Sequence, residues 1–170
     1  NNEIVADMLR YDAAPGFAHA DGTPPDPSKA IARLERWRFG LDDSSNGFTV
    51  ERLDDLASEY PRFDERFAGL PYRHGYFATT HHEYGRAAMF DQLAHFDFAT
   101  GNKTSWALPR GDFTSEPIFV PRDTGEGVGY LLAVIFRGAE LRSDLVILDA
   151  ENIDQGPLAT AHLETRVPFG

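Results

Sequence analysis

The chain lacks several features that would indicate common classes of function. It contains no cysteine, which excludes a disulfide scaffold, thiolate metal ligands and a cysteine nucleophile. Basic residues are scarce, because 16 Lys and Arg stand against 27 Asp and Glu and give a net charge of -11. A nucleic-acid-binding protein or a polybasic membrane anchor presents clustered positive charge, so the composition argues against both classes.

Long apolar runs and the common catalytic motifs are absent as well. No run approaches the roughly 20 residues of a transmembrane helix, and the first residues lack the pattern of a signal peptide, so we expect a cytoplasmic protein. The sequence has no HExxH, GxSxG, Walker A or GxGxxG motif. The glycine-rich segment 125–129 is acidic and precedes an expected strand rather than a helix, which makes it a poor phosphate cradle.

Alternation of apolar and polar residues dominates what is present and predicts a structure that is almost entirely β. Residues 130–136 form a continuous apolar run rich in β-branched side chains, which is typical of a buried strand, and residues 145–148 form another. Short helical turns are expected only around residues 56–57 and 64–67. With 42% hydrophobic residues, the chain has the composition of a folded globular protein.

The turns fall into three similar units. Each unit runs through a strand, an Asp/Gly turn, a second strand and a Pro-containing segment, and the leading residues Asp42, Asp97 and Asp149 are 55 and 52 positions apart. A period near 50 with short strands is typical of β-propeller blades and is not expected of a sandwich. Three blades do not close a ring and would leave unpaired faces. We therefore expect the chain to be part of a larger propeller.

Two acidic residues stand at equivalent places in successive units. Glu59 and Glu116 each lie beside a proline and apolar residues, in the segment expected to form the innermost strand of a blade. That strand lines the central channel of a propeller, where ligands bind. A carboxylate in such surroundings must be paired or hydrogen-bonded. A common partner is the N–H of a metal-bound imidazole.

The histidines themselves show no convincing metal-site pattern. His81 and His82 are adjacent, so in a strand their side chains would point to opposite faces. The spacing of His74 and His81 matches no common metal site, and His95 and His162 fall on expected strands, where packing or surface roles are favoured. The sixth histidine is His19.

An ordered series of segments in the second half of the chain resembles a known family. The segments are SEPIFVPR at 115–122, GYLL at 129–132, LVILDA at 145–150, GPLA at 156–159 and RVPFG at 166–170. The series is similar to the C-terminal part of the carotenoid cleavage oxygenases, also called the retinal pigment epithelial membrane protein family. Bacterial lignostilbene dioxygenases and apocarotenoid oxygenases look most similar. The resemblance extends over the whole chain and is strongest over residues 115–170.

This resemblance implies a fold and a chemistry. The family fold is a seven-bladed β-propeller, of which residues 1–170 would supply roughly the last three blades as the C-terminal part of a single domain. In the family, four histidines from four blades hold Fe(2+) on the propeller axis, and three glutamates accept hydrogen bonds from their imidazoles. Neutral imidazoles suit Fe(II). The enzymes use O2 to split a C=C bond of a carotenoid, apocarotenoid or stilbene into two carbonyl products.

The family's residues carry over only in part. Glu116 in Ser-Glu-Pro-Ile-Phe matches one of the orienting glutamates, and Glu59 in Ser-Glu-Tyr-Pro-Arg-Phe matches another. The resemblance places the iron-binding histidines before Asn1 and after Gly170, and His74 is not expected to be a ligand. This chain would then contain no metal ligand and no catalytic residue, and would be inactive by itself. The implied partners are an apolar or phenolic alkene, the rest of the propeller and, for access to carotenoids, a membrane surface.

Two other readings of the residues stay open at this point. A non-catalytic propeller that serves as an interaction module would show exposed aromatic residues at its blade edges and no inward carboxylates. A calcium-dependent propeller hydrolase, such as a lactonase, needs Asp, Asn or Glu oxygens that converge on the axis, and Glu59 and Glu116 could supply them. A histidine soon after Gly170 would support the oxygenase, whereas Asn or Asp there would favour the hydrolase.

Overall fold

The structure is a computed structural model that describes residues 2–13, 17–24, 26, 31–41, 47–82 and 89–168. Within these residues it contains twelve β-strands and two three-residue 3-10 helices. In chain order these are β1 (Glu3–Tyr11), β2 (Ala32–Gly40), β3 (Phe48–Arg52), β4 (Ser58–Phe63), η1 (Glu65–Phe67), β5 (His74–Thr79), β6 (Gln92–Asp97), β7 (Lys103–Ala107), β8 (Phe113–Thr114), β9 (Ile118–Pro121), β10 (Gly129–Arg137), β11 (Arg142–Asp149), η2 (Ile153–Gln155) and β12 (Pro157–His162). No helix in the described part of the chain is long and apolar enough to cross a bilayer.

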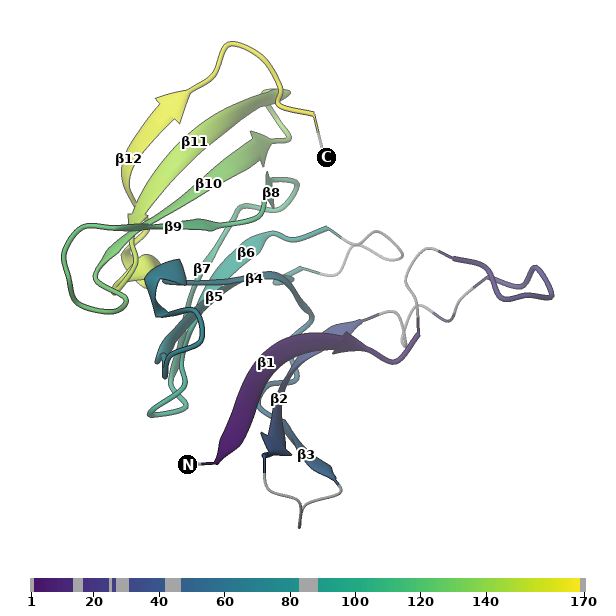
Figure 1. Cartoon of the computed structure of the whole chain (residues 1–170). Coiled ribbons are helices and arrows are strands. Elements are labelled where there is room, and N and C mark those ends of the chain that lie inside the picture. Colours follow the sequence, from purple (N-terminus) through teal and green to yellow (C-terminus); the bar gives the residue numbers. More distant parts are fainter. Residues whose placement is uncertain are drawn as a thin grey trace. The chain divides into compact units, whose positions relative to one another are not determined.

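The strands form three antiparallel sheets, each built from consecutive strands (Figure 1). The sheets have the orders β1-β2-β3, β4-β5-β6-β7 and β12-β11-β10-β8, and β9 pairs with β10 beside β8. The prediction of an almost entirely β structure is thereby confirmed. The chain divides into two compact units, Asn1–Ser58 and Glu59–Gly170, and each is described by itself. The prediction that the whole chain belongs to one domain stays a prediction.

The first unit is the β1-β2-β3 sheet, whose two faces differ in chemistry. On one face Trp37 stacks on Phe48 with ring centroids 4.9 Å apart, and Phe39 packs beside both. On the other face Arg36 binds the Asp7 carboxylate through two hydrogen bonds of 2.7 and 2.8 Å. This division follows from strand geometry, because alternate residues point to opposite faces.

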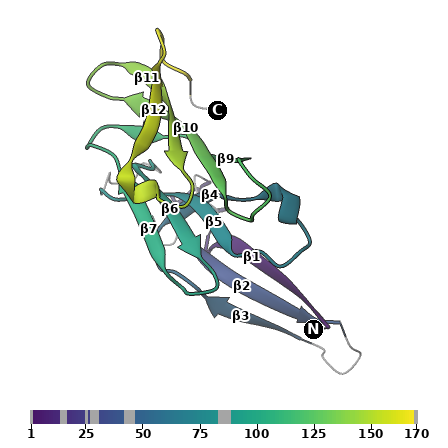
Figure 2. The same cartoon turned by 90° about the vertical axis from the view of Figure 1, so that its left-hand side faces the viewer.

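The second unit contains the other two sheets, which pack face to face (Figures 1 and 2). Tyr76 and Leu93 of the β4-β5-β6-β7 sheet share one core with Leu131, Ile135 and Leu148 of the other sheet, and all five are fully buried. In β10 the buried residues alternate with half-buried ones. The apolar run at 130–136 is therefore a strand, as predicted, with one face in the core and the other partly open to solvent.

The Asp/Gly turns that define the repeat occupy matching places. The Asp97 turn joins β6 to β7, and the Asp149 turn leads from β11 through η2 to β12. Asp97 makes the first turn because its carboxylate accepts the N–H groups of Ala99 and Thr100, while Gly101 adopts a positive φ of 74°. The turn that begins at Asp42 lies outside the described residues, which omit 42–46.

Some local predictions were wrong. The helical turn at 64–67 is η1, which Asp64 caps by accepting the N–H of Arg66, but residues 56–57 form no helix. The chain instead enters β4, an edge strand that contains Pro61 and Glu59. The adjacent residues His81 and His82, for which no strand was predicted, follow β5, and both of their N–H groups donate to the buried Asp91 carboxylate.

Candidate functional site

Glu116 lies in a bulge at the edge of its sheet. Thr114 of β8 pairs with Ile135, and Ile118 of β9 pairs with Leu132, so the three residues 115–117 stand opposite only two residues of β10. An extra residue in one strand bends the backbone and turns a side chain out of the regular ladder. The bulge therefore directs Glu116 away from the normal alternation of the strand.

The residues on both sides of Glu116 hold the bulge in place. The N–H of Ser115 donates to the carbonyl of Val134 at 2.8 Å, and the Ser115 hydroxyl accepts the Val134 N–H at 3.0 Å. The same hydroxyl donates to the carbonyl of Glu116. Pro117 is fully buried. With both neighbours fixed, the backbone of Glu116 has little freedom to move.

Glu59 lies on β4, which is the corresponding edge strand of the other sheet. The following residue, Tyr60, adopts a positive φ of 53°. A left-handed conformation at a bulky residue costs about 1–3 kcal/mol and persists only where the surroundings enforce it. One contribution is visible in the Tyr60 ring, which meets Phe90 edge to face at 5.7 Å. The strand is irregular beside Glu59, as it is at Glu116.

The electrostatic surroundings of the two glutamates differ. Burial raises the pKa of Glu59, and the N–H of Tyr60, which donates to the carboxylate at 3.3 Å, opposes that effect. Glu116 forms an ion pair with Arg62, which lies three residues beyond Glu59 on β4. The structure thus brings the strand that carries Glu59 into direct contact with Glu116.

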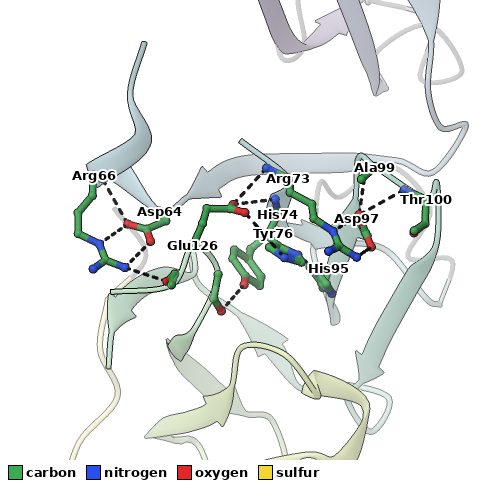
Figure 3. Close-up of polar contacts among 12 residues, drawn as sticks. Asp64, Arg66, Arg73, His74, Tyr76, His95, Asp97, Ala99, Thr100 and Glu126 are labelled. Atoms are coloured by element: carbon green, nitrogen blue, oxygen red, sulfur yellow. Dashed lines mark hydrogen bonds and ion pairs between the residues drawn. The ribbon is translucent and has the colours of Figure 1, made fainter. Parts of the chain in front are cut away.

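The hairpin that follows Glu116 is fastened to the neighbouring sheet (Figure 3). Its tip, residues 122–128 between β9 and β10, contacts Arg66 of η1 and His74 of β5. Arg66 holds the buried Asp64 with hydrogen bonds of 2.9 and 2.6 Å and donates to the carbonyls of Asp123 and Gly125. Glu126 accepts the backbone N–H of His74 at 3.0 Å. These contacts fix the position of β9 relative to β5 and η1.

Gly127 shows why this tip is rich in glycine. Its φ is 75°, and a Cβ atom there would collide with the His74 ring. Its carbonyl also lies 3.5 Å from the Tyr76 hydroxyl, which donates to it. Glycine at this position thus allows close packing of the tip on the sheet.

A pair of histidines that the sequence did not connect lies under this tip. Nδ1 of His74 and Nε2 of His95 are 2.8 Å apart, so one ring donates and the other accepts. His95 is buried and stacks on Tyr76 with ring centroids 5.2 Å apart. On its other side Thr104 lies 3.5 Å from Nδ1. Of the packing and surface roles expected for His95, the structure shows packing, against a partner 21 positions away in the chain.

The pair predicts a pH dependence of stability. Burial lowers the pKa of His95 to about 4, helped by His74 and Arg73 and opposed by Asp97. The native state then keeps His95 neutral where the unfolded chain, with a pKa near 6.5, takes up a proton. The stability that depends on neutral His95 is therefore fully present above about pH 6.5 and is lost as the pH falls toward about 4. The measurement is the free energy of unfolding with urea across this pH window. His95→Gln should reduce its slope with pH by at most about 1.4 kcal/mol per pH unit. An unchanged slope would contradict this assignment.

A metal site within this chain is not indicated by the described residues. In the ranges given above, no three His, Asp or Glu side chains gather closely enough to hold a metal ion. His74 and His95 face each other, and His82 binds Asp91. The two glutamates singled out by the sequence are instead placed on edge strands of two adjoining sheets.

Comparison with solved structures defines the class of fold. The chain superposes on the lignostilbene dioxygenase of Pseudomonas brassicacearum with a TM-score of 0.89 and 30% identity, over 98% of this chain and 37% of that one. It also matches the cobalt-substituted apocarotenoid oxygenase of Synechocystis with a TM-score of 0.86 and 28% identity, over 99% and 36% of the two chains. The fold is therefore part of a carotenoid oxygenase β-propeller, as the repeat predicted.

The family model named Retinal pigment epithelial membrane protein matches residues 1–170, so the chain belongs to that family. It is 38% identical to lignostilbene-alpha,beta-dioxygenase isozyme III of Sphingomonas paucimobilis, over 94% of this chain and 35% of the relative. It is 35% identical to isoeugenol monooxygenase of Pseudomonas nitroreducens, over 97% and 37%. The chain thus spans little more than a third of the length of these relatives.

Proposed function

We propose that the full-length protein is a non-haem Fe(II) oxygenase that uses O2 to cleave the C=C bond of an apolar or phenolic alkene into two carbonyl products. Membership of the family and the similarity to enzymes named as dioxygenases and oxygenases support the reaction class. The observation that carries the proposal is the placement of Glu59 and Glu116 beside irregularities on edge strands of two adjoining sheets.

The role assigned to these two residues is to orient imidazoles. A carboxylate that accepts the free N–H of a metal-bound histidine fixes the ring and its tautomer and strengthens it as a ligand. When bound, the iron supplies the site at which O2 is activated. Glu116 and Glu59 then act only as hydrogen-bond acceptors, while the protein around them keeps their carboxyl groups in place.

The chemistry of the two residues fits this role. Burial disfavours the charged form of a carboxylate, and it raises the pKa of Glu59. An imidazole N–H donated to Glu59 would offset it. The cobalt-substituted form of the Synechocystis enzyme supports a metal in the family fold. Glu59 and Glu116 are therefore proposed as acceptors for the imidazoles and not as ligands of the metal.

The comparisons favour a phenolic aryl alkene as the substrate class. The names of two similar relatives specify lignostilbene and isoeugenol, which both carry a C=C bond conjugated to a phenol ring. An apocarotenoid is the second candidate, supported by the Synechocystis enzyme at 30% identity. Cytoplasmic location and contact with a membrane surface stay predictions from the sequence.

The test is made on the full-length protein, loaded with Fe(II) under anaerobic conditions. We expect stoichiometric iron, O2 uptake coupled to the loss of a phenolic stilbene, and two aldehyde products. Removing the iron with a chelator should abolish turnover, and restoring it should recover turnover. Full activity without iron or O2, or lactone hydrolysis that depends on Ca²⁺, would contradict the proposal and favour the hydrolase.

A further inference from the structure

Arg62 connects the two edge strands on which the candidate glutamates lie. It belongs to β4, the strand of Glu59, and its guanidinium forms an ion pair with the Glu116 carboxylate. The two residues are 54 positions apart in the chain, so the contact exists only because the two sheets adjoin. Arg62 also lies 3.7 Å from the carboxylate of Glu65 at the start of η1.

The geometry of the pair suits positioning better than stabilisation. The side chains of Arg62 and Glu116 are 37% and 42% exposed, and ion pairs that are this accessible contribute little to folding stability. The guanidinium contacts Oε1 of Glu116. A carboxylate can accept several hydrogen bonds through its two oxygens, so an imidazole N–H can bind at the same time.

The backbone is restrained next to both Arg62 and Glu116. Arg62 follows Pro61 and the left-handed Tyr60, while Glu116 lies in the bulge fixed by Ser115 and Pro117. The contact joins one guanidinium nitrogen of Arg62 to Oε1 of Glu116, so the positive charge and a single hydrogen bond hold that oxygen in place. The ion pair therefore restrains the remaining freedom of Glu116, which is that of its side chain.

We propose that Arg62 is a positioning residue that orients the Glu116 carboxylate toward its imidazole partner and keeps it aligned with Glu59 on the adjoining strand. This inference rests on the proposed function, since the imidazole belongs to the iron site. The contacts of Arg62 are with Glu116 and Glu65. Its effect passes through Glu116, so replacing it should alter metal binding only while Glu116 is present.

The experiment measures Fe(II) dissociation from the full-length protein by competition with a chromogenic chelator. We expect Arg62→Gln to weaken Fe(II) binding by about tenfold, which is at the lower end of the effect of losing an imidazole partner. Arg62→Lys keeps the charge and should bind within about threefold of the unaltered protein. Glu65→Gln removes the other carboxylate near Arg62 and serves as the matched control, with unchanged binding.

A double-mutant cycle separates positioning from a general structural effect. In the Glu116→Gln background, Arg62→Gln should cause no further loss of Fe(II) binding, because the group on which it acts is already gone. If Arg62→Gln is insoluble, Arg62→Met replaces it, since it keeps the length of the apolar stem. Additive losses, or failure of lysine to restore binding, would overturn the proposal.

The outcome for Arg62 is also distinct from that for the proposed function. If Glu116→Gln weakens Fe(II) binding and Arg62→Gln or Arg62→Met does not, the role of Arg62 is wrong and the iron oxygenase stands. If the unaltered full-length protein binds no Fe(II), the proposed function itself fails.

Discussion

Replacing Glu116 by glutamine in the full-length protein should lower Fe(II) affinity and alkene cleavage by about 10–100-fold, the usual cost of losing the carboxylate partner of a metal-bound histidine. The substitution keeps the size of the side chain but removes its charge. It also offers an N–H₂ group where the imidazole N–H needs an acceptor. Iron content after dialysis and the rate of cleavage measure the two effects independently.

Glu59→Gln should act in the same direction, because Glu59 holds the corresponding place on the adjoining edge strand. The matched control is Glu140→Gln, whose side chain is 56% exposed and pairs with Arg142. This control should retain iron and activity. If all three variants behave alike, the assignment of Glu59 and Glu116 as orienting residues is wrong.

The sequence was sufficient to predict the architecture because the repeat is encoded in local turn chemistry. Asp97 and Asp149 mark turns at matching places, and the first turn depends on hydrogen bonds within four residues of Asp97. Such signals are visible in a single sequence because the residues that make them are neighbours in the chain. The apolar run at 130–136 is equally local.

The candidate site was only partly predictable. Equivalence in the repeat was enough to single out Glu59 and Glu116. The bulge at Glu116 and the left-handed backbone at Tyr60 have no sequence signature, since they arise from how the strands pair. The ion pair between Arg62 and Glu116 joins two sheets, and nothing near either residue indicates it.

The wrong predictions have a similar origin. The segment around residues 56–57 was expected to be helical from local composition, but the chain there leads into β4, whose pairing with β5 depends on the tertiary fold. His95 and His74 are likewise brought together only by the pairing of β5 with β6. Long-range strand pairing overrides weak local preferences.

A second large effect is expected at the C-terminal end of β10, where Arg137→Ala should lower the free energy of unfolding by about 1.5–3 kcal/mol. Arg137 bridges two carboxylates, with contacts of 2.9 Å to Asp112 and 2.7 Å to Asp144. The side chain of Asp144 is only 2% exposed. Burial would raise the pKa of Asp144, but the hydrogen bonds from His162 and Arg137 outweigh it, and the pKa is lowered.

The cost arises because alanine removes the guanidinium that joins the two carboxylates, although Asp144 keeps its contacts with Arg142 and His162. Urea unfolding of the full-length protein, followed by tryptophan fluorescence, measures it. Arg122→Ala is the matched control, since the pair of Arg122 with Glu151 at 3.6 Å is well exposed and its loss should change stability by less than about 1 kcal/mol. Because a lowered carboxyl pKa adds stability only above the unfolded value, the difference between the variants should shrink as the pH falls below about 4. Equal stabilities for the two variants at neutral pH would show that the Arg137 network is not needed to hold the sheet.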